Sequence, residues 1–341
     1  PTSYCAYPFT AQFPDLISHT LIVEDTNEKE LRDVFRMGAW ALSSLTIGGI
    51  RITFLPLFDD ALNRLSSFLN FSDEHILVYS CYAIANLTIG GEARIDAVLN
   101  RNVGPRMVEL MMHRNLNIQF SAVKTVGVIL SGPSQDAQEL IQAGVITQLK
   151  TLIGSNEPKI RRESCFAISN LVATENTDVI QSMLFADTYT LAQLVQLANE
   201  DETSVCLEVA HIFAVTMLYG KSSQCLNLIQ AGSLQAVIKV LKDHNPPEHL
   251  IVLTLSSWLH LLSVATKEDW TKDDLTASVN FYATPKDPRS KSDSRKRKAN
   301  ALLDLFKLVG VWDFVDQNKV NTNSAKGNLV NELLQYKNPF Y

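Results

Sequence analysis

The chain has 341 residues, of which 46% are hydrophobic and 19% are charged, and its formal net charge is −6. These values exclude a chain that is disordered throughout, and the acidic balance disfavours non-specific nucleic-acid binding and suits basic partners. Five cysteines, none in a CxxC pair, favour a reducing, intracellular compartment. We expect a fragment or a processed chain because the first residue is Pro1, and the start shows no secretory signal pattern.

Similar helical segments recur at a regular interval. The segment RESCFAISNL centres on Phe166, and steps of 42 residues backwards and 45 residues forwards reach comparable positions. These anchor residues are Trp40, Tyr82, Lys124, Phe166, His211 and Ser256. A residue four positions later lies one turn further along the same helical face. These partners are Ser44, Asn86, Val128, Asn170, Val215 and His260.

A second recurring element separates the anchor segments at 99–111, 140–153 and 228–241. In each copy a glycine is expected to form a sharp turn between a short helix and a longer amphipathic helix. These glycines are Gly104, Gly144 and Gly232. Prolines then precede the third helix, where the first turn tolerates them. A three-helix unit of this kind cannot bury its own apolar face, so the pattern predicts stacked repeats, almost no strand and an extended concave surface.

The repeats are predicted to occupy residues 8–284, with the helices of the first unit beginning at 8–23. Residues 285–298 carry a net charge of +5 without apolar periodicity, which indicates a disordered insertion. That insertion has three open interpretations: a solvated loop, a nuclear localisation signal, or a pseudo-substrate that folds back onto the acidic repeats. Residues 299–341 are predicted to form a C-terminal capping repeat.

Nothing in the sequence favours an enzyme. We find no GxGxxG, GxxxxGK[ST] or HExxH motif, and we expect no cofactor. His211 and His260 are single histidines on helices, for which a core or groove role is favoured over metal binding. The longest apolar run, Leu250–Ala265, is interrupted by polar residues and is short for a membrane span of about 20 residues, so we expect a buried repeat helix.

The repeat signature resembles that of armadillo repeats, and specifically those of the importin-alpha (karyopherin-alpha) family. In that family successive third helices carry a Trp and, four residues later, an Asn. The segments similar to its fourth to seventh repeats are 38–49, 81–91, 122–132 and 163–174. Lys124 is a basic residue where other repeats have Trp, as in the sixth repeat of the family. The sequence from 308 to the C-terminus is similar to the family's tenth, capping repeat.

The resemblance implies an armadillo-repeat, right-handed superhelical solenoid that serves as a nuclear import adaptor. It would bind Lys/Arg-rich nuclear localisation signals of cargo proteins in a concave groove, work with importin-beta and an export carrier, and occupy cytoplasm and nucleus. Neither membrane nor direct nucleic-acid binding is expected. Aromatic faces would hold the basic side chains, and amides would form hydrogen bonds with the peptide backbone. Carboxylates would neutralise the positive charges of the peptide side chains. The expected peptide-binding residues are Trp40, Ser44, Tyr82, Asn86, Lys124, Glu163, Phe166, Asn170, Glu208 and His211.

Several positions depart from the family pattern, so we expect reduced or altered peptide affinity. Of the repeats that form the family's major pocket, the sequence shows only the fourth, in which Ser44 replaces Asn. In the repeats of the minor pocket, Phe166 and His211 replace Trp, Val128 and Val215 replace Asn, and Ser134 replaces an acidic residue. Three alternatives remain open. The anchor aromatics could pack in the core, Glu163 and Glu208 could lie on a solvated face, and the protein could be a scaffold for another extended peptide.

Overall fold

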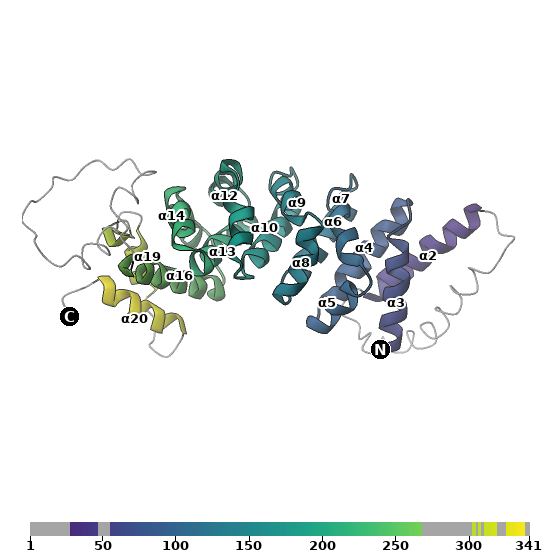
Figure 1. The fold of residues 1–341 in the computed structure, drawn as a ribbon, viewed down its shortest axis with the longest axis horizontal. Helices are drawn as coiled ribbons and strands as arrows, with labels where there is room; N and C mark the ends of the chain where they lie inside the picture. Colours follow the sequence, from purple (N-terminus) through teal and green to yellow (C-terminus); the bar gives the residue numbers. More distant parts are fainter. Residues whose placement is uncertain are drawn as a thin grey trace, which may run out of the picture. The chain divides into compact units, whose positions relative to one another are not determined.

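The computed structural model describes residues 28–46, 55–267, 302–304, 306–307, 310–318 and 325–337 (Figure 1). Within these ranges the regular structure is helical and contains no strand, which confirms the predicted all-α fold class. The helices expected at 8–23, the basic segment 285–298 and the boundary at 284 lie outside the described residues.

The third helices of the repeats carry the anchor residues. Prolines precede or begin two of them as predicted: α10 starts at Pro158, and Pro247 directly precedes α16. Asp73 caps α4 by accepting hydrogen bonds from the N–H groups of His75 and Ile76. The third helices are α2 (Glu28–Thr46), α4 (Glu74–Thr88), α7 (Leu116–Ile129), α10 (Pro158–Val172), α13 (Thr203–Tyr219) and α16 (Glu248–Lys267).

Shorter helices connect the third helices. The first helices are α5 (Glu92–Leu99), α8 (Ser134–Gln142), α11 (Thr177–Ile180), which continues into the π-helical turn η1 (Gln181–Phe185), and α14 (Ser222–Gln230). The helices that precede a third helix are α3 (Leu55–Phe68), α6 (Val103–Leu110), α9 (Val145–Leu152), α12 (Thr188–Glu200) and α15 (Ser233–Asp243). The chain ends with α19 (Val311–Gln317) and α20 (Ala325–Lys337).

Left-handed residues form the turns before the second helices. Gly144 and Gly232 have φ angles of 92° and 89°, which confirms the predicted turns there. The prediction for Gly104 is wrong, because Asn102 adopts the left-handed conformation at φ 59° and Gly104 lies inside α6. Asparagine tolerates this left-handed conformation. At Gly104 a glycine fits because neighbouring side chains pack closely against it. A Cβ atom there would lie 3.0 Å from both Glu139 Oε1 and Leu140 Cδ2.

The second helices vary in length between repeats, and α3, which belongs to a 42-residue interval, has 14 residues. α12 and α15 have 13 and 11 residues, whereas α6 and α9 have 8 each. The first helices hardly change, since α8 and α14 both have 9 residues. The order of the elements is the same in the 42- and 45-residue intervals between α4 and α16.

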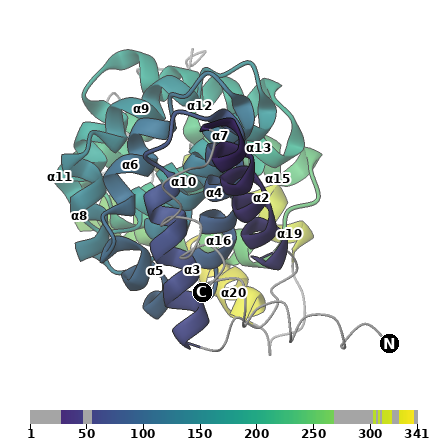
Figure 2. The ribbon, with the colours of Figure 1, turned by 90° about the vertical axis from the view of Figure 1, so that its right-hand side faces the viewer.

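Contacts divide the chain into two units, residues 1–148 and 149–341. In the N-terminal unit α4 packs between α2 and α7, so three third helices lie side by side (Figures 1 and 2). The rings of Phe35, Phe68 and Phe71 meet edge to face, with centroids 5.2 to 5.7 Å apart. This aromatic cluster joins α2 to α3 and to the turn before α4.

In the C-terminal unit α13 packs between α10 and α16, and α20 packs against α16 (Figure 1). Trp258 is fully buried, with ring centroids 6.1 Å from those of Phe306 and Phe314, and these aromatic rings close the end of the unit. Within α16, the stretch Glu248–Ala265 is the one described helix segment long and apolar enough to span a membrane. Half of that stretch is buried against the rest of the protein.

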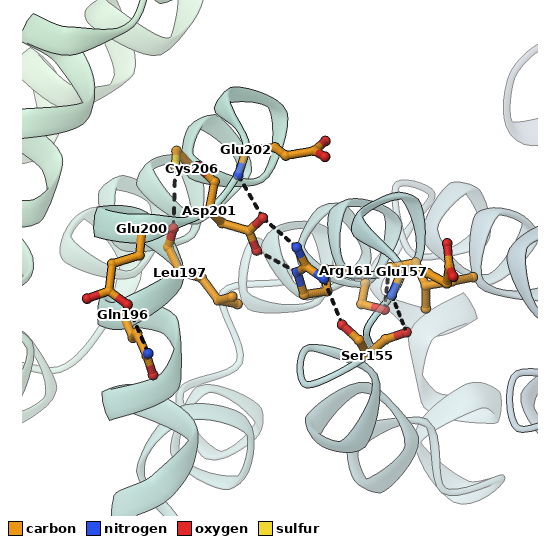
Figure 3. Close-up of polar contacts among 11 residues, drawn as sticks. Ser155, Glu157, Arg161, Gln196, Leu197, Glu200, Asp201, Glu202 and Cys206 are labelled. Atoms are coloured by element: carbon orange, nitrogen blue, oxygen red, sulfur yellow. Dashed lines mark hydrogen bonds and ion pairs between the residues drawn. The ribbon is translucent and has the colours of Figure 1, made fainter.

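Ion pairs connect successive repeats at separations close to the repeat length. Arg36 pairs with Asp73 at 2.6 Å, and Lys150 pairs with Asp187 at 2.6 Å, each across 37 residues. Figure 3 shows the guanidinium of Arg161 facing the Asp201 carboxylate, 40 residues further on. Arg161 also donates to the Ser155 carbonyl at 2.8 Å, so one side chain links the start of α10 to the turn before α13.

The Arg161–Asp201 pair is the most enclosed of these ion pairs, since its side chains are only 16% and 6% exposed. Burial raises the pKa of Asp201, but hydrogen bonds from Arg161 and from the Glu202 N–H outweigh it, and the net shift is downward. A carboxyl whose pKa is lower in the folded state stabilises the protein above its unfolded pKa and loses that contribution as the pH falls.

We expect Arg161→Ala to lower the free energy of unfolding by about 3 kcal/mol at pH 7, because it leaves the buried Asp201 charge without its partner. Urea denaturation measures this loss. The difference from wild type should shrink as the pH falls below about 4 and Asp201 becomes protonated. Lys159→Ala, an exposed site on the same helix, is the control. Equal losses of stability in both variants, or a loss that does not depend on pH, would contradict the role of Arg161 as the partner of the Asp201 charge.

Asp136 in the first turn of α8 is a buried carboxylate with an unsatisfied oxygen. A carboxylate at this third helical position normally accepts a hydrogen bond from the N–H of the capping residue. Here the cap is Pro133, which has no N–H. Asp136 is 7% exposed, and its Oδ2 accepts no hydrogen bond among the described residues. Burial, with the charges of Asp96 and Glu92, raises its pKa.

We therefore expect Asp136→Asn to stabilise the protein at pH 7 by about 1 kcal/mol, because it removes a buried charge. Since the folded-state pKa is raised, wild-type stability gains from protonation as the pH falls, and the advantage of the variant should disappear towards pH 4. Thermal melting followed by circular dichroism tests this. Asp60→Asn, an exposed carboxylate on α3, should have no comparable effect.

Candidate functional site

The third helices of the N-terminal unit expose large aromatic side chains. Trp40 on α2 is 55% exposed and Tyr82 on α4 is 40% exposed. Their chain neighbours Ala39 and Cys81 are fully buried, and burial raises the pKa of the Cys81 thiol to about 12. The interpretation of Trp40 and Tyr82 as core residues is therefore wrong. Lys124 occupies the equivalent position on α7 and is half-buried.

Two polar partners of these anchors differ in how they are held. The Ser44 hydroxyl donates to the Trp40 carbonyl of its own helix at 2.8 Å. Asn86 Nδ2 donates to Thr46 Oγ1 at 3.3 Å, across from α4 to α2. An amide has a second N–H and a carbonyl oxygen, so this bond orients Asn86 and leaves capacity for a ligand.

A shallow pocket of about 290 Å³ adjoins Trp40 and is also lined by Arg36, Met37, His75 and Tyr79. Sequence reasoning missed Met37 and Tyr79, although each lies three residues before an anchor and so on the same helical face. Met37 is 67% exposed. No carboxylate is among the lining residues, and Arg36 is itself paired with Asp73 and Asp33. The pocket therefore offers apolar and aromatic contact rather than negative charge.

The C-terminal unit brings a different set of predicted residues together. Phe166 and Asn170 are half-buried on α10, and His211 is half-buried on α13. Val215 is 3% exposed, so this partner of His211 lies in the core and not on the surface. Burial and then the nearby His249 lower the pKa of His211, which favours its neutral form at neutral pH.

Glu163 and Glu208, which we call the acidic pair, approach each other from α10 and α13. Glu163 is 8% exposed, so its placement on a solvated face is wrong. Arg162 links the two carboxylates, with Nη1 2.9 Å from Glu163 Oε1 and Nη2 3.8 Å from Glu208 Oε1. Burial raises the pKa of Glu208, Arg162 lowers it and Glu163 raises it, with a net upward shift. Sequence reasoning missed Arg162, which lies one turn before Phe166.

The predicted residues thus fall into two separate sets. Trp40, Tyr82 and Lys124 lie on successive packed helices of one unit, while the acidic pair lies with Phe166 and His211 in the other. Among the described residues, no group of three or more His, Cys, Asp or Glu side chains is placed to hold a metal ion. Ser134 begins α8.

Comparisons with known proteins agree with this architecture. The family model for the armadillo/beta-catenin-like repeat matches residues 133–173. Importin subunit alpha-1a of Oryza sativa subsp. japonica is 31% identical over 169 residues, which cover 48% of this chain and 31% of the rice protein. Importin subunit alpha-4 of Arabidopsis thaliana is 27% identical over 263 residues, which cover 77% of this chain and 47% of the Arabidopsis protein. The chain thus spans less than half of these relatives.

Solved structures with the same fold include designed proteins. One designed armadillo repeat protein has a TM-score of 0.61 at 22% identity, covering 73% of this chain and 99% of its own. Another designed armadillo repeat protein, solved in complex with peptide (KR)4, has a TM-score of 0.59 at 23% identity. The match covers 73% of this chain and 99% of the designed protein. At these identities the likeness supports the fold alone.

Proposed function

We propose that this helical-repeat chain, which is similar to importin alpha subunits, is a nuclear import adaptor that binds extended Lys/Arg-rich signal peptides. The observation that carries this proposal is the exposure of Trp40 and Tyr82 on neighbouring third helices. Large exposed aromatic side chains in register on packed helices provide contact area that the core does not use.

The exposed side chains suit the chemistry of such a peptide. Aromatic faces of Trp40 and Tyr82 attract cationic heads and contact the aliphatic stems of Lys and Arg. Asn86, oriented by Thr46, offers an amide to an extended peptide backbone. Peptide binding in the designed protein solved with (KR)4 is a precedent for the fold.

The proposed cellular role rests on the similarity to importin alpha subunits. We propose cargo proteins with basic signals as partners, importin-beta and an export carrier as further partners, and residence in cytoplasm and nucleus. The peptide-binding residues in this proposal remain the ten predicted above, with Met37 and Tyr79 added to the face around Trp40. The protein needs no catalytic step for this role.

A scaffold that binds a different extended peptide is the second candidate. The pocket beside Trp40 has no lining carboxylate, and Arg162 already pairs with Glu163 and Glu208. Both features reduce the negative charge available to a basic peptide. A peptide with apolar or aromatic side chains would use the same exposed aromatics.

The test is a titration of the full chain with a fluorescein-labelled Lys/Arg-rich peptide, followed by anisotropy. Trp40→Ala and Tyr82→Ala should each weaken binding by about tenfold, because each removes one aromatic contact with a cationic side chain. Tyr189→Ala is the matched control, since Tyr189 is 70% exposed but lies on α12, a second helix.

A peptide of the same length with Leu in place of Lys and Arg distinguishes the two candidates. A preference for the basic peptide that is lost in both Trp40→Ala and Tyr82→Ala and kept in Tyr189→Ala supports the import-adaptor function. Preference for the Leu peptide with the same variant pattern favours the scaffold. Basic-peptide binding that neither Trp40→Ala nor Tyr82→Ala weakens would contradict the proposed site.

A further inference from the structure

Arg162 is the exposed member of a three-residue charge cluster. Its side chain is 47% exposed, whereas the side chains of Glu163 and Glu208 are 10% and 19% exposed. The guanidinium therefore covers two carboxylates that are largely withdrawn from solvent. Because Arg162 lies four residues before Phe166, it shares that residue's face of α10.

The neighbouring arginine on α10 has a different role. Arg161 is 16% exposed and is bound to Asp201 and to the Ser155 carbonyl. It links structural elements through these two partners. Arg162, by contrast, pairs with both members of the acidic pair.

The charge balance of the cluster is unequal. Two carboxylates with one guanidinium leave a formal charge of −1 when all three are ionised. The separations also differ, at 2.9 Å to Glu163 and 3.8 Å to Glu208. The longer one is beyond hydrogen-bond distance, so Glu208 is held less firmly. Without Arg162 the two like charges would repel each other, which favours binding of another cation or protonation of one carboxyl.

We propose that Arg162 is an intramolecular competitor for basic peptide side chains at the acidic pair. This inference rests on the proposed function and specifies its selectivity. The guanidinium occupies the position where the cationic head of a peptide Lys or Arg would bind. An incoming basic side chain must displace Arg162, so the wild-type protein discriminates against Lys and Arg at this position and accepts an uncharged side chain there.

The experiment compares Arg162→Gln with wild type, as full chains, using the same Lys/Arg-rich peptide. Arg162→Gln should lower the dissociation constant about fivefold, the factor that corresponds to one partly exposed ion pair. Binding by the variant should also weaken more steeply with added salt, since it gains an ion pair with the peptide. Lys159→Gln, exposed on the same helix, makes the same change in net charge and should leave affinity unchanged. Arg162→Lys should also behave like wild type, because it restores the competing cation.

A double-mutant cycle separates direct competition from a change in folding. In a Glu163→Gln/Glu208→Gln background, adding Arg162→Gln should give no further gain in affinity, because the acidic pair has been removed. Thermal melting of each variant confirms that it is folded.

Two failures are distinguishable. If wild type binds the basic peptide and Arg162→Gln binds it equally or more weakly, the competitor role is overturned and the proposed function stands. If neither chain binds, the proposed function and the competitor role fail together. A gain that survives in the Glu163→Gln/Glu208→Gln background also overturns the competitor role.

Discussion

Each third helix buries one face against the third helices of neighbouring repeats, and this packing determines which side chains remain exposed. In the N-terminal unit α4 lies between α2 and α7, and Cys81, Ile84 and Ala85 are buried. Helical geometry then directs Tyr82 outwards. The same constraint turns Trp40 outwards on α2. Exposure of the aromatics is therefore a consequence of how the core is built.

Several charged side chains link neighbouring repeats. Arg36, Lys150 and Arg161 each reach an aspartate about one repeat away, and Arg162 covers the acidic pair. Part of the negative charge on the third helices is therefore already paired within the protein. Selectivity for a basic ligand depends on which carboxylates lack an internal partner.

The repeat period was a sufficient guide to the order of the helices, because regularly spaced apolar residues and prolines mark each third helix. It also predicted left-handed turns at Gly144 and Gly232. It was wrong at Gly104, since Asn102 can adopt the same conformation without being a glycine. Period alone also missed the ion pairs, whose partners are adjacent only after the repeats stack.

The sequence alone determined the all-helical repeat architecture and which residues share each third-helix face, because these follow from local spacing along one helix. Only the tertiary structure decided whether a given face is open. It exposes Trp40 and Tyr82, buries Val215, and places Arg162 over Glu163 and Glu208. The physical reason is that burial and ion pairing depend on neighbouring helices, and side-chain reach between repeats is not encoded in the spacing within one repeat.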